Sequence, residues 1–133
     1  MALLDGLLNR LQSEPRLSDI QIVEDESIDD KTFHFKVRAT IEPAKLQIRF
    51  LSDRDFKRYS FQLFSHRPLA RWDNTPHYPD LPNFPHHFHN ADNEVSASSL
   101  TGNLLSDVEI VLAEVKRFVA LLDQSDEEVD TTN

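Results

Sequence analysis

Alternating apolar and polar residues dominate the middle of the chain and predict β-strands. Over residues 32–41 every second residue is apolar, and the residues between are polar or basic. Residues 45–51 repeat this period of two. Because successive side chains of a strand point to opposite faces, the two segments predict a hairpin that turns near Pro43. One of its faces is apolar and the other is polar and basic.

Weaker patterns on either side of this hairpin extend the predicted sheet. Residues 59–65 and 69–74 resemble strands, and the polar residues 52–57 are expected to form the turn before them. A short alternating segment at residues 19–23 comes before an acidic stretch, residues 24–31, which is expected to be a turn. Antiparallel pairing permits a sheet with one buried apolar face and one solvated polar face. The sequence thus predicts four or five antiparallel strands.

Apolar residues at helical spacing predict one helix near each end of the chain. Leucines recur every three or four residues between Leu3 and Leu11, and this helix is expected to stop before Pro15. A longer stripe of the same kind runs from Leu104 to Leu122. The second helix is expected to cover the apolar face of the sheet, with the first helix beside it.

These elements predict an α+β domain, with a single antiparallel sheet packed by a C-terminal helix and flanked by an N-terminal one. The chain has 133 residues, which is the usual size of one domain, predicted here over residues 1–123. The acidic residues 124–133 are predicted to be a disordered tail. Cysteine is absent, which excludes thiolate nucleophiles and thiolate metal sites. No signal peptide or membrane-spanning run is apparent, so a cytoplasmic location and no membrane partner are expected.

Charge is distributed unevenly along a chain whose net charge is −9. Residues 31–90 contain ten Lys and Arg against five Asp and Glu, whereas residues 1–30 and 91–133 are strongly acidic. A basic face can bind an RNA backbone even when the whole chain is acidic. An ordinary solvated strand face is the alternative. The candidate backbone-binding residues on the predicted hairpin are Lys36, Arg38, Lys45 and Arg49.

Residues suited to proton transfer are concentrated between Arg71 and His89, where four histidines fall within thirteen residues. Imidazole gives and takes protons near neutral pH. RNA cleavage without a metal needs a base, an acid and a cation for the phosphate. The candidates are His86 and His89 as the acid–base pair, His87 and His77 as further histidines, Arg71 as the phosphate clamp and Asp73 as the carboxylate that orients a histidine.

Two other interpretations of the same segment stay open. His86, His87 and His89 are candidate metal ligands, completed by His77 or Asp73, although their spacing matches no standard zinc signature. A polar loop whose histidines only form hydrogen bonds is the other alternative, and no cofactor is expected. The aromatic candidates for stacking on a base are Trp72, Tyr78 and Phe88, with burial in the core as the alternative for Trp72.

The run from Arg71 to His89, R-W-D-N-x-P-H-x-P-x-L-x-x-F-P-H-H-x-H, resembles the TumE-like family of prokaryotic toxin–antitoxin proteins. Members of that family read R-Y-D-N-A-P-H-H-P followed by F-P-H-H-K-H, and the resemblance covers residues 45–120. It implies a small, metal-independent ribonuclease toxin, loosely related in form to RelE-like toxins. It also implies a helix-turn-helix antitoxin as the partner.

The chain departs from the family pattern at three positions. Trp72 replaces the usual Tyr, Tyr78 replaces a His, and Phe88 replaces a Lys between the last two histidines. These replacements remove a cation and an imidazole from the site that the resemblance implies, although the acid–base pair remains. A non-catalytic RNA- or protein-binding module is therefore the first alternative, and a metal-binding histidine loop the second. The sequence leaves the RNA target and the oligomeric state, including a homodimer, undetermined.

Overall fold

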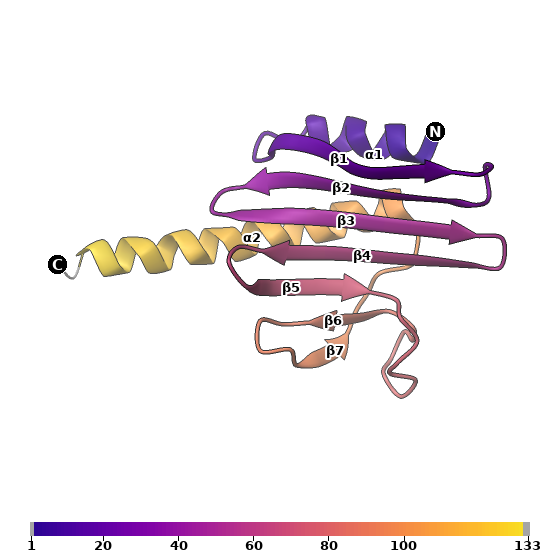
Figure 1. Ribbon diagram of the computed structural model, residues 1–133. Coiled ribbons are helices and arrows are strands. Elements are labelled where there is room, and N and C mark those ends of the chain that lie inside the picture. The colour runs from indigo at the N-terminus through magenta and orange to yellow at the C-terminus, as the bar shows by residue number, and fades with distance from the viewer. Residues whose placement is uncertain (1, 132–133) are drawn as a thin grey trace.

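The chain forms one seven-stranded antiparallel sheet in which each strand pairs with the next along the chain. Figure 1 shows the computed structural model, which describes the backbone of residues 2–131 and the side chains of residues 2–123. The elements are α1 (Ala2–Gln12), β1 (Ser18–Ser27), β2 (Phe33–Ile41), β3 (Ala44–Asp53), β4 (Phe56–Phe64), β5 (Pro68–Asp73), β6 (His87–His89), β7 (Val95–Ala97) and α2 (Leu104–Thr131).

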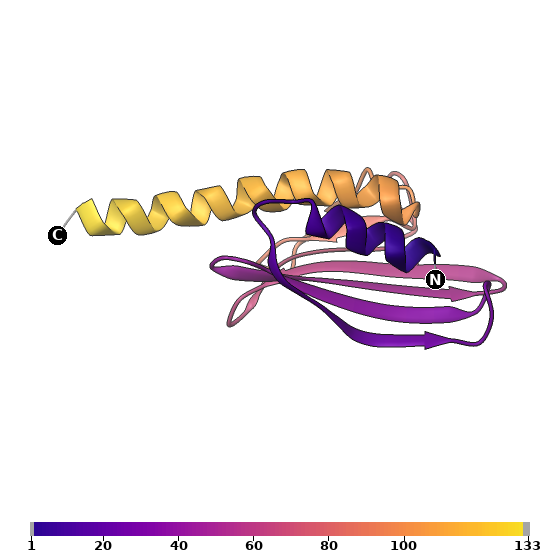
Figure 2. The same ribbon diagram turned by 90° about the horizontal axis from the view of Figure 1, so that it is seen from above.

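Both helices lie on the same face of the sheet, as the view in Figure 2 shows. Leu7 and Leu11 of α1 and Val111 and Val115 of α2 are buried in one hydrophobic core with the apolar strand residues. This burial is the main favourable contribution to folding. No helix of the described part of the chain has the length and apolarity needed to cross a membrane.

The face of the sheet opposite the helices, here called the open face, carries polar side chains in two rows. The strand register aligns one residue of each row on every strand from β2 to β6. The first row is Lys36, Arg49, Ser60, Asp73 and His87, and the second is Arg38, Gln47, Gln62, Arg71 and His89. The predicted basic face and the histidine segment therefore belong to one continuous surface.

The predicted fold class, an α+β domain with an antiparallel sheet and a helix from each end, is confirmed. The predicted number of strands is wrong, because the sheet has seven rather than four or five. The additional strands are β6, which lies in the histidine-rich segment between Arg71 and His89, and β7, which follows it. Each has only three residues, which is too short for a clear alternating pattern.

Two of the predicted turns are also shorter than expected. β1 continues to Ser27 because its acidic end pairs with the basic β2: Lys36 Nζ lies 2.9 Å from Glu24 Oε1. β4 begins at Phe56, so a tight turn replaces the expected residues 52–57. α2 continues to Thr131, so the backbone is helical over most of residues 124–133, which are predicted to be a disordered tail. The predicted domain boundary at residue 123 stays a prediction.

Candidate functional site

Four polar side chains meet on the open face where β5 pairs with β6. Arg71 and Asp73 alternate with Trp72 along β5, and His87 and His89 lie opposite them on β6. Ligand atoms of Asp73, His87 and His89 all lie within 4.8 Å of one another. We refer to Arg71, Asp73, His87 and His89 as the Asp73 cluster. The period of two in a strand brings its members together.

The carboxylate of Asp73 is the centre of this cluster. Its Oδ1 lies 2.9 Å from His87 Nε2 and accepts a hydrogen bond of 3.0 Å from the backbone N–H of Thr75. Its Oδ2 lies 2.9 Å from Arg71 Nε. Only 5% of Asp73 is exposed, and a buried carboxylate needs such partners. Asp73 therefore joins β5, β6 and the start of the loop after β5.

His87 is held on both sides of its ring. Its Nδ1 lies 3.0 Å from the carbonyl oxygen of Pro85, and its Nε2 faces Asp73. Both partners are acceptors when the carboxylate is ionised, so a doubly protonated ring satisfies both. With 2% exposure, His87 has no ring nitrogen available to a ligand. Its position favours a role in holding Asp73.

His89 is arranged as a neutral imidazole. Arg71 Nη2 lies 3.1 Å from its Nε2, and a guanidinium can only donate. The neutral ring therefore carries its proton on Nδ1, which lies 3.0 Å from Asn93 Oδ1. Burial is the main cause that lowers the pKa of His89; the charge of Arg71 lowers it further, and the hydrogen bond with Asn93 opposes the shift. This environment favours a ring able to act as a base.

Arg71 connects the cluster to solvent. Its side chain is 45% exposed, although its Nε and Nη2 are bound to Asp73 and His89. Arg71 and His89 line a groove of about 290 Å³ on the open face together with Gln62 and Asn93. A guanidinium has five N–H donors, so the outer edge of Arg71 remains suited to binding a phosphate.

The cluster suits a metal ion poorly. The structure groups Asp73 with His87 and His89, which are three of the candidate metal ligands, whereas His86 is not in this group. The Arg71 guanidinium already contacts Asp73 Oδ2 and His89 Nε2, which are the atoms that a metal ion would need. A divalent ion would have to displace this permanent charge.

His86 lies apart from the cluster, on the side of the helices. Its Nδ1 is 2.7 Å from the hydroxyl of Tyr59, and the two rings are stacked with centroids 5.8 Å apart. Burial lowers the pKa of His86 and raises that of Tyr59, so the Tyr59 hydroxyl keeps its proton within this hydrogen bond. The predicted pairing of His86 with His89 stays a prediction.

The other predicted site residues are more dispersed. His77 is exposed, and its ring centroid lies 6.3 Å from that of Tyr78. Tyr78 packs edge-on against His87, with centroids 4.8 Å apart. Trp72 is 4% exposed and donates from Nε1 to Glu114 at 3.1 Å, so it lies in the core. Phe88 packs against it, with ring centroids 5.1 Å apart.

The four basic residues predicted to bind the RNA backbone lie on the open face, and three of them have partners. Lys36 is paired with Glu24. Arg38 donates to Gln47 at 2.6 Å, and Arg49 Nε lies 3.0 Å from His34 Nε2. Lys45 is exposed. Phe64 is absent from the predicted set, although it occupies a polar position in the alternation of β4 together with Ser60 and Gln62. An aromatic residue at a position where polar residues alternate is the sequence signal that could have identified Phe64 as a site residue.

Comparison with known proteins finds a family match that covers both the sheet and the Asp73 cluster. A protein-family model described as Toxin TumE matches residues 7–120. That range contains every strand of the sheet and all four residues of the Asp73 cluster. No curated protein matches the chain, and no solved structure matches it.

Proposed function

The chain belongs to the Toxin TumE family, and from this premise we propose that it acts as a toxin by cleaving RNA without a metal ion. The observation that carries the proposal is the pair formed by Arg71 and His89. A permanent cation and an imidazole favoured in its neutral form lie 3.1 Å apart and line the same groove on the open face. Phosphate binding and proton abstraction need this combination.

The proposed reaction starts when a phosphate of the RNA binds to Arg71 and draws its Nη2 away from His89. Nε2 of His89 then takes the proton of the adjacent 2′-hydroxyl. The 2′-oxygen attacks phosphorus, and the bond from phosphorus to the 5′-oxygen breaks. The products are a 2′,3′-cyclic phosphate and a 5′-hydroxyl, the latter protonated by an acid. Asp73 acts through Arg71 by holding the guanidinium at Nε.

We propose His77 as the acid. Its ring is exposed and lies beside Tyr78, whose ring centroid is 6.1 Å from that of His89. His87 is unsuited because it is 2% exposed, whereas His89 lines the groove beside Arg71. His86, which the sequence predicts as a member of the acid–base pair, is hydrogen-bonded to Tyr59 and is the alternative candidate for the acid.

The test is cleavage of single-stranded RNA in excess EDTA by the parent protein and by three variants, His89→Ala, His77→Ala and His86→Ala. We expect the parent and His86→Ala to cleave, leaving 2′,3′-cyclic phosphate ends. Removal of a general base or acid lowers the rate by about 10²- to 10⁴-fold, which is the loss expected for the other two variants. Circular dichroism checks that each variant folds.

Each other outcome has a definite meaning. Intact RNA with the parent, both with EDTA and with added divalent ions, contradicts the nuclease proposal. Cleavage only with added ions contradicts its metal independence. Loss of cleavage in His86→Ala alone assigns the chemistry to the Tyr59–His86 pair.

A non-catalytic RNA-binding protein is the second candidate, and the two polar rows of the open face support it. It predicts RNA affinity that falls with salt and no cleavage. For either candidate we propose a cytoplasmic site of action and a helix-turn-helix antitoxin as the partner. Co-purification of the chain with the product of a neighbouring small gene, together with rescue of growth by that gene, tests the partner.

A further inference from the structure

Phe64 places an aromatic ring on the mainly polar open face. It follows Ser60 and Gln62 at alternate positions of β4 and is half-buried. The guanidinium carbon of Arg38 lies over its ring, 5.8 Å from the centroid. Phe64 is not part of the core that the helices cover. An aromatic ring combined with an arginine on a polar surface is suited to stacking on a nucleobase.

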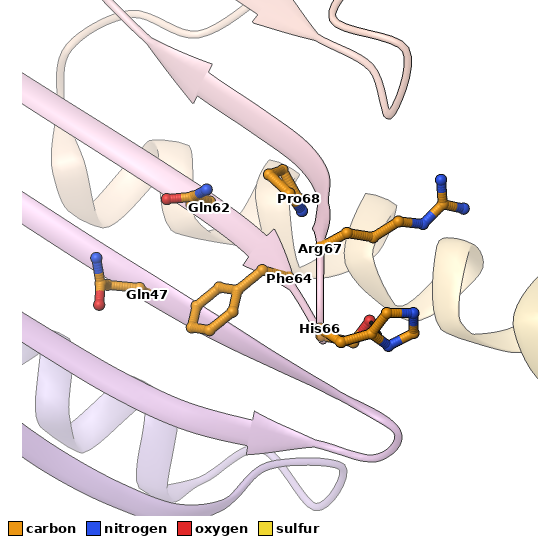
Figure 3. Close-up of a pocket in the computed structure, with 7 residues that line it drawn as sticks. Gln47, Gln62, Phe64, His66, Arg67 and Pro68 are labelled. Carbon is orange, nitrogen blue, oxygen red and sulfur yellow. Dashed lines mark hydrogen bonds between the residues drawn. The ribbon is translucent and has the colours of Figure 1, made fainter.

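The ring lines a groove of about 240 Å³ at the end of β4. Figure 3 shows Phe64 among the side chains of Gln47, Gln62 and Pro68. Side-chain amides carry both donors and acceptors, as the edge of a base does. The Oε1 of Gln47 accepts hydrogen bonds from Arg38, so the NH₂ group of Gln47 can donate to a ligand. No Asp or Glu is among the described residues that line this groove, so nothing there repels a phosphate chain.

The Phe64 groove adjoins the groove of Arg71 and His89, and the two share Gln62 and Pro68 as lining residues. Gln62 lies opposite Arg71 in the strand register. With about 4.8 Å between strands and about 3.3 Å per residue along a strand, the Cα atoms of Phe64 and Arg71 are roughly 8 Å apart. One nucleotide of an extended strand spans such a distance.

We propose that the Phe64 groove is a nucleobase subsite for single-stranded RNA. The base next to the phosphate held by Arg71 stacks on Phe64, and Gln47 and Gln62 form hydrogen bonds with its edge. This inference rests on the proposed function for the identity of the ligand. It adds that the protein binds unpaired RNA, because a base within a duplex has no free face to stack on the ring.

The test uses a single-stranded RNA hexanucleotide with 2′-O-methyl sugars and a 5′-fluorescein label. The methyl group removes the nucleophile, so fluorescence anisotropy reports binding alone. Stacking loss corresponds to roughly a tenfold rise in Kd, and we expect this for Phe64→Leu. The matched control is Phe56→Leu, because Phe56 is on the same strand, 42% exposed and also under an arginine, with Arg58 4.9 Å from its ring centroid. We expect the control to keep the parent Kd.

A second series replaces each nucleotide in turn by an abasic one. In the parent, one position is expected to weaken binding by about tenfold, and in Phe64→Leu that position is expected to have no further effect. Equal abasic effects in both proteins, an unchanged Kd for Phe64→Leu, or an equal loss in Phe56→Leu overturns the subsite. Failure of the parent to bind the oligonucleotide also overturns it.

The two proposals fail separately. A parent that shows the Phe64-dependent abasic position but leaves unmodified RNA intact retains the subsite and loses the nuclease. A parent that cleaves RNA while Phe64→Leu binds normally retains the nuclease and loses the subsite. Circular dichroism of Phe64→Leu excludes unfolding as the cause of weaker binding.

Discussion

The buried carboxylate of Asp73 is expected to stabilise the fold substantially, and its removal measures by how much. Its bonds with His87 and with the backbone of Thr75 lie in a site where Asp73 is 5% exposed. A hydrogen bond to a charged group contributes about 1.5–3 kcal/mol. The ion pair with Arg71 adds about 1 kcal/mol at most, because Arg71 is 45% exposed. Asp73→Ala is therefore expected to lower the free energy of unfolding by about 3–5 kcal/mol.

Asp73→Asn separates charge from shape. The amide oxygen can still accept from His87 and Thr75, but the NH₂ group then faces the donor Nε of Arg71. A loss of about 2 kcal/mol is expected. Urea unfolding measures both variants, followed by circular dichroism and by the fluorescence of Trp72, the only tryptophan in the chain. The control is Asp80→Asn, an exposed carboxylate on the same loop, expected to change stability by no more than about 0.5 kcal/mol.

A loss below about 1 kcal/mol for Asp73→Ala, with coincident transitions for both probes, would refute this reasoning. The loop and β6 would then be held by packing rather than by the carboxylate. A loss in Asp80→Asn equal to that in Asp73→Ala would contradict it as well, because a general effect of net charge would explain both.

Three further predictions concern single residues. Trp72→Phe removes the hydrogen bond to Glu114 and is expected to lower the unfolding free energy by about 1 kcal/mol; circular dichroism in urea measures it, and an unchanged midpoint contradicts it. Gly102 has φ +89°, so Gly102→Ala is expected to lower the free energy of unfolding by about 1–2 kcal/mol through backbone strain. A steric clash does not contribute, because the added Cβ would lie at an ordinary 3.6 Å from the nearest atom. Equal unfolding free energies of the two proteins would disprove the strain. Because burial lowers the pKa of His89 below the usual 6.5, the base stays neutral down to that pKa. The acid limb of the kcat/KM profile for RNA cleavage is therefore expected below pH 6.5, and a limb above that value argues against His89 as the base.

The sheet could be predicted from sequence where its two faces differ chemically. β2, β3 and β4 have an apolar side under the helices and a polar side in solvent, and this difference produces the alternating pattern. β6 carries the same pattern in its shortest form, with Phe88 between His87 and His89. Three residues near several prolines are too few to distinguish a strand from a loop in the sequence. In the structure the segment is a strand, in which Phe88 pairs with Trp72 of β5.

The site was predictable in part for the same reason. Alternation predicts that His87 and His89 share a side, and the structure places them together with Asp73. The position of His86 depends on where β6 begins, which the sequence does not indicate. Asn93, which binds His89, comes from the turn after β6, and its contact depends on a left-handed backbone with φ 60°.

The pairing of every strand with its successor has a consequence for synthesis of the protein. Each hairpin can form as soon as its second strand leaves the ribosome, because each strand pairs with the next strand along the sequence. α2 emerges last, and it reaches back to α1 through an ion pair between residues 99 positions apart, Arg10 and Glu109. Until then the part of the apolar side that α2 covers faces water, where exposed apolar surface promotes aggregation. We therefore expect translation that stops before Leu104 to yield an aggregation-prone fragment.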